Sequence, residues 1–481
     1  MKRVILLAIA CYSLAVVLAV VCSSSALSSP RTRAKTGSSA PHPGLKKIET
    51  NKYSPTFTDP VVFDNLWRSW DAASRAAAEK ASDKARRQMI LERYGLLEAP
   101  YDNAGAPLGM IVEKDGSWAM SCLICHAGAV EGKTILGLPN NSLDFSSLFE
   151  DTAATITILH GDKPGNPPFT QGLLFLTGGK PAAHVEYPEG LLSASKGNFN
   201  SFTFSVNFMS FRDGDLNMRE QPLDLKPLNH YLDPPPLWFT AKKKAFYSDG
   251  FAEKSIRPLM QFSLDPSFTP AEFKSWEEDY KDIYAWLHTI DSPKYQGVIN
   301  KNLAARGQQV YSETCAACHG VPGRGGAYPN TVVPVELVNT DRARLDGLSP
   351  DFKKHFSNSW MGKFGETNIT TNSKGYVAPP LDGIWASAPY FHNGSVPTVY
   401  HVLFPDERPT VWKVKDYRGY DNTRVGLQVE EYKRMPETHT LTEKRMYYDT
   451  TRATMGNGGH PFADGLSREQ RLSVLEYLKS L

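Results

Sequence analysis

The chain holds few cysteines, and none is available for a structural disulfide. Of the six cysteines among 481 residues, Cys11 and Cys22 lie in an apolar N-terminal segment. The other four form two Cys-x-x-Cys pairs. A fold held together by disulfides is therefore excluded, and the paired spacing is typical of cysteines that bind a metal or a cofactor.

An excess of charge of either sign is also lacking. The chain has 53 Lys and Arg residues against 51 Asp and Glu residues, which gives a formal net charge of +2. Lys2 and Arg3 account for this difference, so the rest of the chain is balanced. A balanced chain creates no long-range field that would attract nucleic acid or an anionic membrane. We therefore expect no nucleic-acid partner.

The N-terminal residues have the pattern of an export signal. Two basic residues precede a mostly apolar stretch from Val4 to Val21, and small residues follow from Ser23 to Ala26. This pattern predicts a signal peptide over residues 1–26. Because the apolar stretch is long, an uncleaved membrane anchor is the alternative. Either interpretation predicts a periplasmic or secreted protein with no membrane association beyond that N-terminal anchor.

Length and composition indicate more than one folded domain. Hydrophobic residues make up 41% of the chain and charged residues 22%, which is typical of globular rather than disordered proteins. A chain of 481 residues exceeds what a single hydrophobic core usually supports. Residues 27–56 are rich in Ser, Thr, Pro and Lys and are predicted to be a flexible tether. Asp291-Ser292-Pro293 ends a helical pattern, which predicts domains over residues 57–294 and 295–481.

Hydrophobic periodicity and capping signals predict mainly helices. Thr269-Pro270-Ala271-Glu272 has the spacing of a capping box that opens a helix, and Ser467 with Gln470 repeats this spacing before the last helix. Asp115-Gly116 between two apolar runs predicts a β-hairpin. Further helices are expected over residues 62–97 and 303–314. The expected fold class is mainly α, with long loops and a few short β-hairpins.

Two five-residue Cys-x-x-Cys-His patterns carry the chemistry of the chain. They are Cys122-Leu123-Ile124-Cys125-His126 and Cys315-Ala316-Ala317-Cys318-His319. This pattern is typical of c-type haem attachment, because two sulfurs on one turn can each bond a vinyl group of the same porphyrin. The adjoining histidine then lies beneath the iron as its proximal ligand. The sequence thus predicts two covalently bound haem c groups. A zinc site made of the four thiolates is the alternative, but it leaves both histidines unexplained.

The ligand on the other side of each iron decides what each haem does. A strong sixth ligand makes a haem an electron relay, whereas an open position admits oxygen or peroxide. After His319, the residues alone leave Met361, His392 and His460 nearly equal as candidates. After His126, no candidate lies in a distinctive pattern, which favours an open iron there. The candidates after His126 are His160, His184, Met209, Met218 and His230.

A proline run between the two patterns holds a tryptophan. Trp238 follows the segment Pro234-Pro235-Pro236-Leu237. A stiff segment of this kind could place the indole between the edges of two haems, where it would assist electron transfer. The alternative is an ordinary buried tryptophan in a proline-rich loop.

At these residues the chain resembles the di-haem cytochrome c peroxidase superfamily, which includes the MauG enzymes. Within it, the rubber-oxygenase-like di-haem c-type cytochromes are the most similar. The resemblance rests on the two Cys-x-x-Cys-His units and on the Pro-Pro-Leu-Trp segment that ends at Trp238. It also rests on Tyr390-Phe391-His392-Asn393-Gly394-Ser395 and on the glycine-rich stretch around His460 before the final helix.

The resemblance implies two cytochrome c-like haem domains. Carried over by motif, it implies that His126 is the proximal ligand of an open haem, while His319 and His460 ligate the second haem from both sides. Trp238 would match the tryptophan between the haems. His392 would be a structural or haem-propionate partner rather than a ligand. The peroxidases instead use a methionine shortly after the motif around His392, and residues 402–406 contain none.

These inferences predict an exported di-haem c-type cytochrome oxidoreductase. The open haem would activate O2 or peroxide, and the bis-histidine haem would relay electrons. The expected partners are a small-molecule oxidant and an unknown electron donor or organic substrate. The alternatives are a non-enzymatic periplasmic electron-transfer cytochrome and a di-haem hydrogen peroxide peroxidase, so the sequence is compatible with both an enzyme and an electron carrier.

Overall fold

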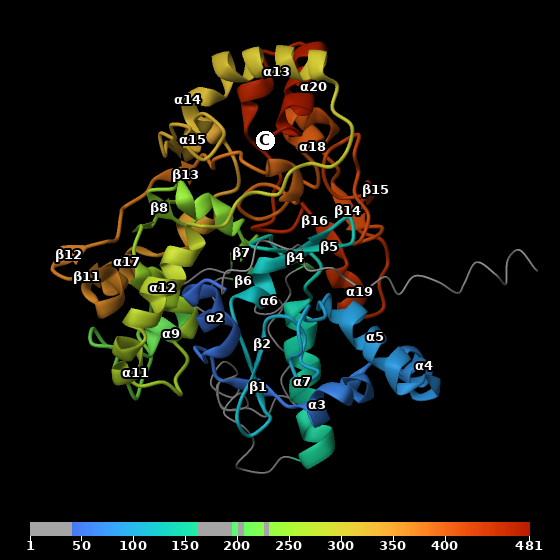
Figure 1. Cartoon of the computed structure of the whole chain (residues 1–481), viewed down its shortest axis with the longest axis vertical. Coiled ribbons are helices and arrows are strands. Elements are labelled where there is room, and N and C mark those ends of the chain that lie inside the picture. The colour runs from blue at the N-terminus through green and yellow to red at the C-terminus, as the bar shows by residue number, and fades with distance from the viewer. Residues whose placement is uncertain (1–40, 162–194, 201–205, 226–229) are drawn as a thin grey trace, which may run out of the picture. The chain divides into compact units, whose positions relative to one another are not determined.

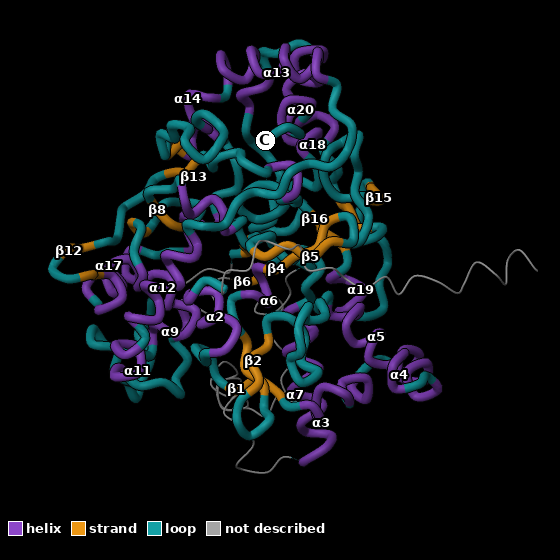
Figure 2. The backbone as a smooth tube through the Cα atoms, viewed as in Figure 1, coloured by secondary structure: helices purple, strands orange, loops and turns teal. Residues whose placement is uncertain are grey.

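Short helices and strands alternate with long loops through the described chain (Figure 2). A computed structural model describes residues 41–161, 195–200, 206–225 and 230–481. It is 41% helical and 14% strand. The fold is therefore mixed, with helices more abundant than strands, and it contains more sheet than the predicted mainly α class. Part of the loop-rich stretch between the two cysteine patterns, residues 162–194, lies outside the described residues.

Helix α2 (Pro43–Thr50) corrects the predicted tether. Its Ile48 is only 1% exposed, and its Lys47 Nζ contacts carboxylate oxygens of Asp279 and Asp282 on α12 (Glu277–Leu287) at 2.9 and 2.6 Å. The tether prediction is wrong for this segment because its short apolar face is too brief to show periodicity in the sequence, yet it packs on α12. The predicted signal peptide and the first part of the tether lie outside the described residues.

The single helix predicted over residues 62–97 is wrong. The segment instead forms α3 (Pro60–Asp64), η1 (Leu66–Ser69), α4 (Ala72–Lys80) and α5 (Asp83–Tyr94). Asp71 accepts a hydrogen bond from the Ser74 amide and Ser82 from the Ala85 amide, so each caps a new helix. Local capping interrupts the helix at both places, although the apolar positions keep a helical period.

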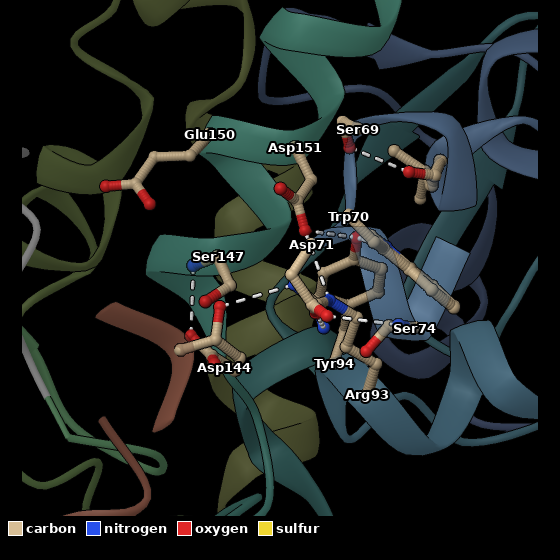
Figure 3. Close-up of polar contacts among 12 residues, drawn as sticks. Ser69, Trp70, Asp71, Ser74, Arg93, Tyr94, Asp144, Ser147, Glu150 and Asp151 are labelled. Carbon is tan, nitrogen blue, oxygen red and sulfur yellow. Dashed lines mark hydrogen bonds and ion pairs between the residues drawn. The ribbon is translucent and has the colours of Figure 1, made fainter. Parts of the chain in front are cut away.

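Helix α7 (Phe145–His160) follows the first cysteine pattern and packs beside α5 through a polar cluster (Figure 3). The Tyr94 hydroxyl donates to Asp151 at 2.6 Å and accepts from the Trp70 indole at 2.8 Å. Asp144 caps the helix by accepting from the Ser147 amide. These bonds fix the chain on the C-terminal side of the first pattern.

The strands form small antiparallel sheets. The hairpin predicted around Asp115-Gly116 is confirmed, because β2 (Met110–Val112) and β3 (Trp118–Met120) pair with Met110 opposite Met120. Strand β1 (Thr56–Thr58) adds to the other edge of β3. The other pairs are β4 (Ala127–Val130) with β5 (Lys133–Leu136), β6 (Phe199–Asn200) with β7 (Tyr231–Leu232), β8 (Ala245–Phe246) with β9 (Ala252–Glu253), β10 (Val332–Pro334) with β13 (Gly375–Val377), β11 (Lys363–Phe364) with β12 (Thr367–Asn368), and β14 (Val411–Val414) with both β15 (Val429–Tyr432) and β16 (Tyr447–Asp449).

The helix before the second cysteine pattern packs against the last helix, as Figure 1 shows for α13 (Lys301–Thr314) and α20 (Arg468–Leu478). The predicted capping boxes at Thr269 and Ser467 are both confirmed. The α13–α20 contact is close because Gly307 has no side chain: a Cβ there would lie 1.9 Å from the carbonyl oxygen of Ser473.

The remaining helices connect these parts. They are α6 (Leu123–His126), α9 (Asn207–Ser210), η4 (Leu237–Ala241), α10 (Ile256–Leu259), η5 (Met260–Ser263), α11 (Pro270–Ser275), α14 (Ala316–His319), α15 (Val335–Val338), α16 (Ala343–Gly347), α17 (Pro350–Asn358), η6 (Trp360–Gly362), η7 (Ile384–Ala386), α18 (Val399–Leu403), η8 (Pro405–Glu407), α19 (Leu441–Arg445) and η9 (Pro461–Ala463). Among the described residues, no helix is long and apolar enough to cross a membrane.

One buried cluster crosses the predicted domain boundary near residue 294. Val130 and Leu138, which follow the first cysteine pattern, belong to the same apolar cluster as Trp385 and Tyr390. Arg445 also joins α19 to α7, because its guanidinium donates two hydrogen bonds to the Glu150 carboxylate. The segments that carry the two patterns are thus parts of one packed unit.

Candidate functional site

The first Cys-x-x-Cys-His pattern lies on one short helical turn between two strands. Helix α6 connects β3 to β4, and the His126 amide donates to the Cys122 carbonyl at 3.0 Å. Gly109 lets the β2 segment approach this turn, because a Cβ there would lie 2.3 Å from the Ile124 nitrogen. The turn brings Cys122, Cys125 and His126 together on one side of the chain.

Burial favours the electrically neutral form of all three side chains. Cys122 is accessible to solvent, yet the protein around it desolvates the thiol and raises its pKa. Burial raises the pKa of the Cys125 thiol to about 12. Burial also lowers the pKa of His126 to about 4, and the Pro235 carbonyl opposes this decrease. A neutral imidazole is the form that binds a metal ion.

The second pattern lies between two helices. Cys315 ends α13 and begins α14, and the His319 amide donates to the Cys315 carbonyl at 3.0 Å. Gly320 then turns the chain with a φ of +74°, where a Cβ would approach the Ala327 carbonyl oxygen to 2.5 Å. The His319 ring is fixed because its Nδ1 lies 2.7 Å from the Pro379 carbonyl oxygen. With Nδ1–H donating to that carbonyl, Nε2 of His319 is free to bind a metal.

His460 faces His319 across the second site. The two ring centroids are 6.2 Å apart. Two imidazoles that bind one metal ion from opposite sides have centroids about 6 Å apart, because each metal–nitrogen bond is about 2 Å long. Nδ1 of His460 is buried without a hydrogen-bond partner, and burial followed by the charge of His319 lowers the pKa of His460 to about 3. The pair therefore fits the two axial ligands of a haem iron.

The other two candidates for this position are held elsewhere. Met361 is fully buried in the same apolar cluster as Phe352 and Phe356. His392 stacks on Tyr376 with ring centroids 4.4 Å apart, and its Nε2 lies 3.9 Å from Asp341 Oδ1. Within the described ranges, His460 is the histidine whose ring lies against His319.

No second histidine ring lies against His126 in the described part of the chain. His160 is exposed at the end of α7, and Met218 is 41% exposed. Met209 is buried in an apolar cluster that also contains Leu123 of the first pattern, and Nε2 of His230 lies 3.4 Å from Arg344. His184 lies outside the described residues. Among the described histidine rings, one thus faces His319 and none faces His126.

The four cysteines do not form a zinc site. Among the described residues, no group of three or more His, Cys, Asp or Glu side chains is placed to hold a metal ion. The zinc alternative requires four thiolates around one ion. The structure keeps the two Cys-x-x-Cys pairs at separate sites, each with its own histidine.

His126 and His319 are each influenced by the carbonyl of the first proline in a Pro-Pro-Leu segment, a correspondence that the sequence analysis missed. The carbonyl of Pro235 acts on His126, and the carbonyl of Pro379 accepts from His319. Pro235-Pro236-Leu237 and Pro379-Pro380-Leu381 each follow a Cys-x-x-Cys-His unit in the chain. This repeated tripeptide is the signal that could have located both segments.

Trp238 joins the two Pro-Pro-Leu segments. Its indole is 4% exposed, and its Nε1 donates to the Asp382 carbonyl oxygen at 2.8 Å. The Asp382 carboxylate binds Lys242 Nζ at 2.7 Å and accepts from the Gly323 amide at 2.5 Å. Asp382 lies three positions after Pro379, whose carbonyl accepts from His319. Trp238 lies three positions after Pro235, whose carbonyl acts on His126. The sequence analysis assigned no role to Asp382 or Lys242.

Comparisons with known proteins point to the same chemistry. The family described as RoxA-like, cytochrome c-like matches residues 375–413, and the family described as cytochrome C oxidase, cbb3-type, subunit III matches residues 302–363. The chain contains a cytochrome c-like domain. Such a domain implies covalently bound haem c and a haem-based electron-transfer or redox function.

Two curated relatives come from Sinorhizobium fredii. The uncharacterized protein y4iM is 26% identical over 237 residues, which cover 40% of this chain and 52% of y4iM. The uncharacterized protein y4iJ is 25% identical over 247 residues, which cover 38% of this chain and 40% of y4iJ. The matched region thus spans about half or less of each relative.

Proposed function

We propose that the protein is an exported di-haem c-type cytochrome oxidoreductase with two unequal haem sites. Cys122, Cys125 and His126 hold one haem, and Cys315, Cys318, His319 and His460 hold the other. Residues 57–294 and 295–481 are then the two cytochrome c-like haem domains, and the compartment is periplasmic or extracellular. A bound haem c group supplies an iron that exchanges electrons and, where one axial position is free, reacts with dioxygen or peroxide.

The observation that carries this proposal is the difference between the two histidines. His460 faces His319 at 6.2 Å, and no described histidine ring faces His126. A haem bound at the second site would be held by His319 and His460 together, which would suit an electron relay. A haem bound at the first site would be held by His126 without a second described histidine, which would leave its iron accessible to O2 or peroxide.

The protein groups around each site hold the ligands in place. The Pro379 carbonyl accepts from Nδ1 of His319, which fixes the ring and directs Nε2 toward the metal position. Apolar residues beside the cysteines exclude water, such as Leu123 at the first site and Ala378 beside Cys318 at the second. A dry environment preserves the neutral imidazoles that a metal requires.

Trp238 supports electron passage between the sites. Its indole is bonded to the Asp382 carbonyl, and its own segment contains Pro235, which acts on His126. A single buried aromatic side chain therefore connects the segments that position both proximal histidines. We assign Trp238 as the inter-site residue on this basis.

Low-temperature EPR of the oxidised holoprotein tests the proposal. We expect one high-spin haem that binds cyanide, or carbon monoxide after reduction, beside one low-spin bis-histidine haem. Two low-spin signals together with no binding of either ligand would show a plain electron carrier instead. Absence of haem absorbance in protein exported to the periplasm would contradict the whole proposal.

A turnover assay separates the two enzymatic possibilities. Hydrogen peroxide consumption driven by a reduced dye identifies a peroxidase, whereas oxygen consumption that depends on an added organic compound identifies an oxygenase. The organic substrate and the electron donor are the partners that this assay would define.

A further inference from the structure

Arg408 connects the loop that carries His460 to the end of helix α18. Its Nε donates to the His401 carbonyl at 2.8 Å and its Nη2 to the Val402 carbonyl at 3.2 Å. Its Nη1 donates to the carbonyls of Asn457 and Gly459 at 2.7 and 2.9 Å. We name this set of four hydrogen bonds the Arg408 bridge. It joins two segments that are more than fifty residues apart in the chain.

The loop needs such a restraint because its own residues impose little order. Gly456-Asn457-Gly458-Gly459 contains three glycines, which lose the most conformational freedom on folding. His460 itself has a φ of +60°, a left-handed conformation that is unfavourable for a residue with a side chain. Other hydrogen bonds also hold this loop: the His460 amide donates to the Val338 carbonyl at 2.7 Å, Asn393 Nδ2 to the Gly456 carbonyl at 2.9 Å, and Asn457 Nδ2 to the Pro409 carbonyl at 3.0 Å.

Arg408 also places a positive charge beside the second site. Its guanidinium lies 4.9 Å from the centroid of Phe391, whose ring centroid is 6.2 Å from that of His460. All its described hydrogen bonds go to neutral carbonyls, and among the described residues no carboxylate forms an ion pair with it, although the charges of Asp464 and Asp406 act on it from a greater distance. A positive charge near a redox centre stabilises the reduced state, because reduction makes the centre less positive.

We propose that Arg408 is a positioning residue for the second haem, which holds His460 in its ligating orientation and raises the reduction potential of that site. This inference rests on the proposed function, because it requires His460 to be the sixth ligand. Two separable effects follow. The four hydrogen bonds fix the ligand, and the charge adjusts the potential.

Arg408→Gln in the full-length holoprotein removes both effects. We expect the ratio of His460-bound to detached haem to fall by roughly 10- to 100-fold, which is the usual range when a residue that orients a metal ligand is lost. EPR should show a new high-spin fraction at the second site that added imidazole converts back to low-spin. The reduction potential of the remaining low-spin form should shift downward.

Arg408→Lys separates the hydrogen bonds from the charge. A lysine keeps the charge but cannot reach both segments with a planar fork, so we expect a high-spin fraction with a much smaller shift in potential. If Arg408→Gln does not accumulate as holoprotein, Arg408→Lys alone tests whether Arg408 positions His460. Low-spin haem at the wild-type potential in Arg408→Lys would then overturn the proposal.

Arg471→Gln is the matched control. Arg471 likewise donates to three backbone carbonyls, those of Leu466, Leu403 and Asp464, and its guanidinium lies 5.4 Å from the centroid of Phe404. None of these described hydrogen bonds goes to residues 456–460. Its substitution should leave spin state and potential unchanged, and equal changes in both variants would show general loosening instead of a specific role.

His460→Ala in the same EPR measurement distinguishes a failure of the proposed ligand set from a failure of the role assigned to Arg408. If His460→Ala leaves the second haem low-spin, the proposed ligand set fails, and the role of Arg408 fails with it. If His460→Ala gives a high-spin haem while Arg408→Gln keeps the wild-type spectrum and potential, only the role of Arg408 is wrong.

Discussion

The turn at His126 and the turn at His319 carry the same five-residue pattern but are held by different surroundings. The first lies between strands β3 and β4, and the second lies between helices α13 and α14. Nδ1 of His319 lies 2.7 Å from a carbonyl acceptor and a second imidazole lies opposite its ring, whereas Nδ1 of His126 is buried without a hydrogen bond, although the Pro235 carbonyl opposes the decrease that burial causes in the pKa of this ring. The same five-residue pattern thus provides one histidine at each turn, and distant parts of the chain determine whether a second histidine faces it.

Among these variants, removal of one cysteine pair should have the largest effect on the difference between the two sites, because it eliminates one of them. In Cys122→Ala/Cys125→Ala, we expect loss of one covalent haem together with the high-spin signal, because both thioether bonds to that haem are gone. In Cys315→Ala/Cys318→Ala, the low-spin signal should disappear instead. A pyridine haemochrome assay counts the haems, and EPR identifies which one remains. Loss of the same signal in both variants would show that the sites are not independent.

His460→Ala should make the second site resemble the first. Loss of the facing imidazole leaves the iron with His319 alone, so the low-spin haem should become high-spin and bind cyanide. His392→Ala is the control, because His392 stacks on Tyr376 and should leave the low-spin spectrum intact. Conversion to high-spin in His392→Ala, but not in His460→Ala, would assign the ligand to His392.

Gly307→Ala should destabilise the second site selectively. The added methyl group would meet the Ser473 carbonyl at 1.9 Å and push α13 away from α20, at a cost of about 1–3 kcal/mol in the free energy of unfolding. Thermal unfolding followed in the low-spin haem spectrum measures this cost. Gly325→Ala is the control, since no atom lies within 4 Å of its added Cβ. Equal losses in both variants would contradict the packing argument.

Trp238→Phe should have the smallest effect on stability among these variants, and it tests whether the two sites exchange electrons through Trp238. It removes the hydrogen bond to the Asp382 carbonyl, which costs about 1 kcal/mol, and it should slow electron exchange between the two haems. Trp385→Phe is the matched control, because Trp385 is also buried and donates to a backbone carbonyl, that of Pro293, at 2.9 Å. Stopped-flow reduction measures the rate of electron exchange between the haems. Equal rates in Trp238→Phe and Trp385→Phe would show that Trp238 has no specific role in this exchange.

Local signals in the sequence were sufficient for some elements and misleading for others. The capping boxes at Thr269 and Ser467 and the hairpin at Asp115-Gly116 formed as predicted, because each depends on residues within a few positions. The helix predicted over residues 62–97 failed because Asp71 and Ser82 start new helices within it. The predicted tether failed at α2 because its partner, α12, lies far along the chain.

The features of the candidate site also divide into those that the sequence predicts and those that only the fold reveals. The sequence by itself determined that each Cys-x-x-Cys-His pattern brings two cysteines and one histidine together, because the pattern places these groups within a single turn. Only the tertiary structure decided that His460 lies opposite His319 and that Trp238 reaches Asp382. It also decided that Arg408 holds the His460 loop. Such contacts join residues brought together by the packing of the whole chain, and neither periodicity nor spacing along the sequence records them.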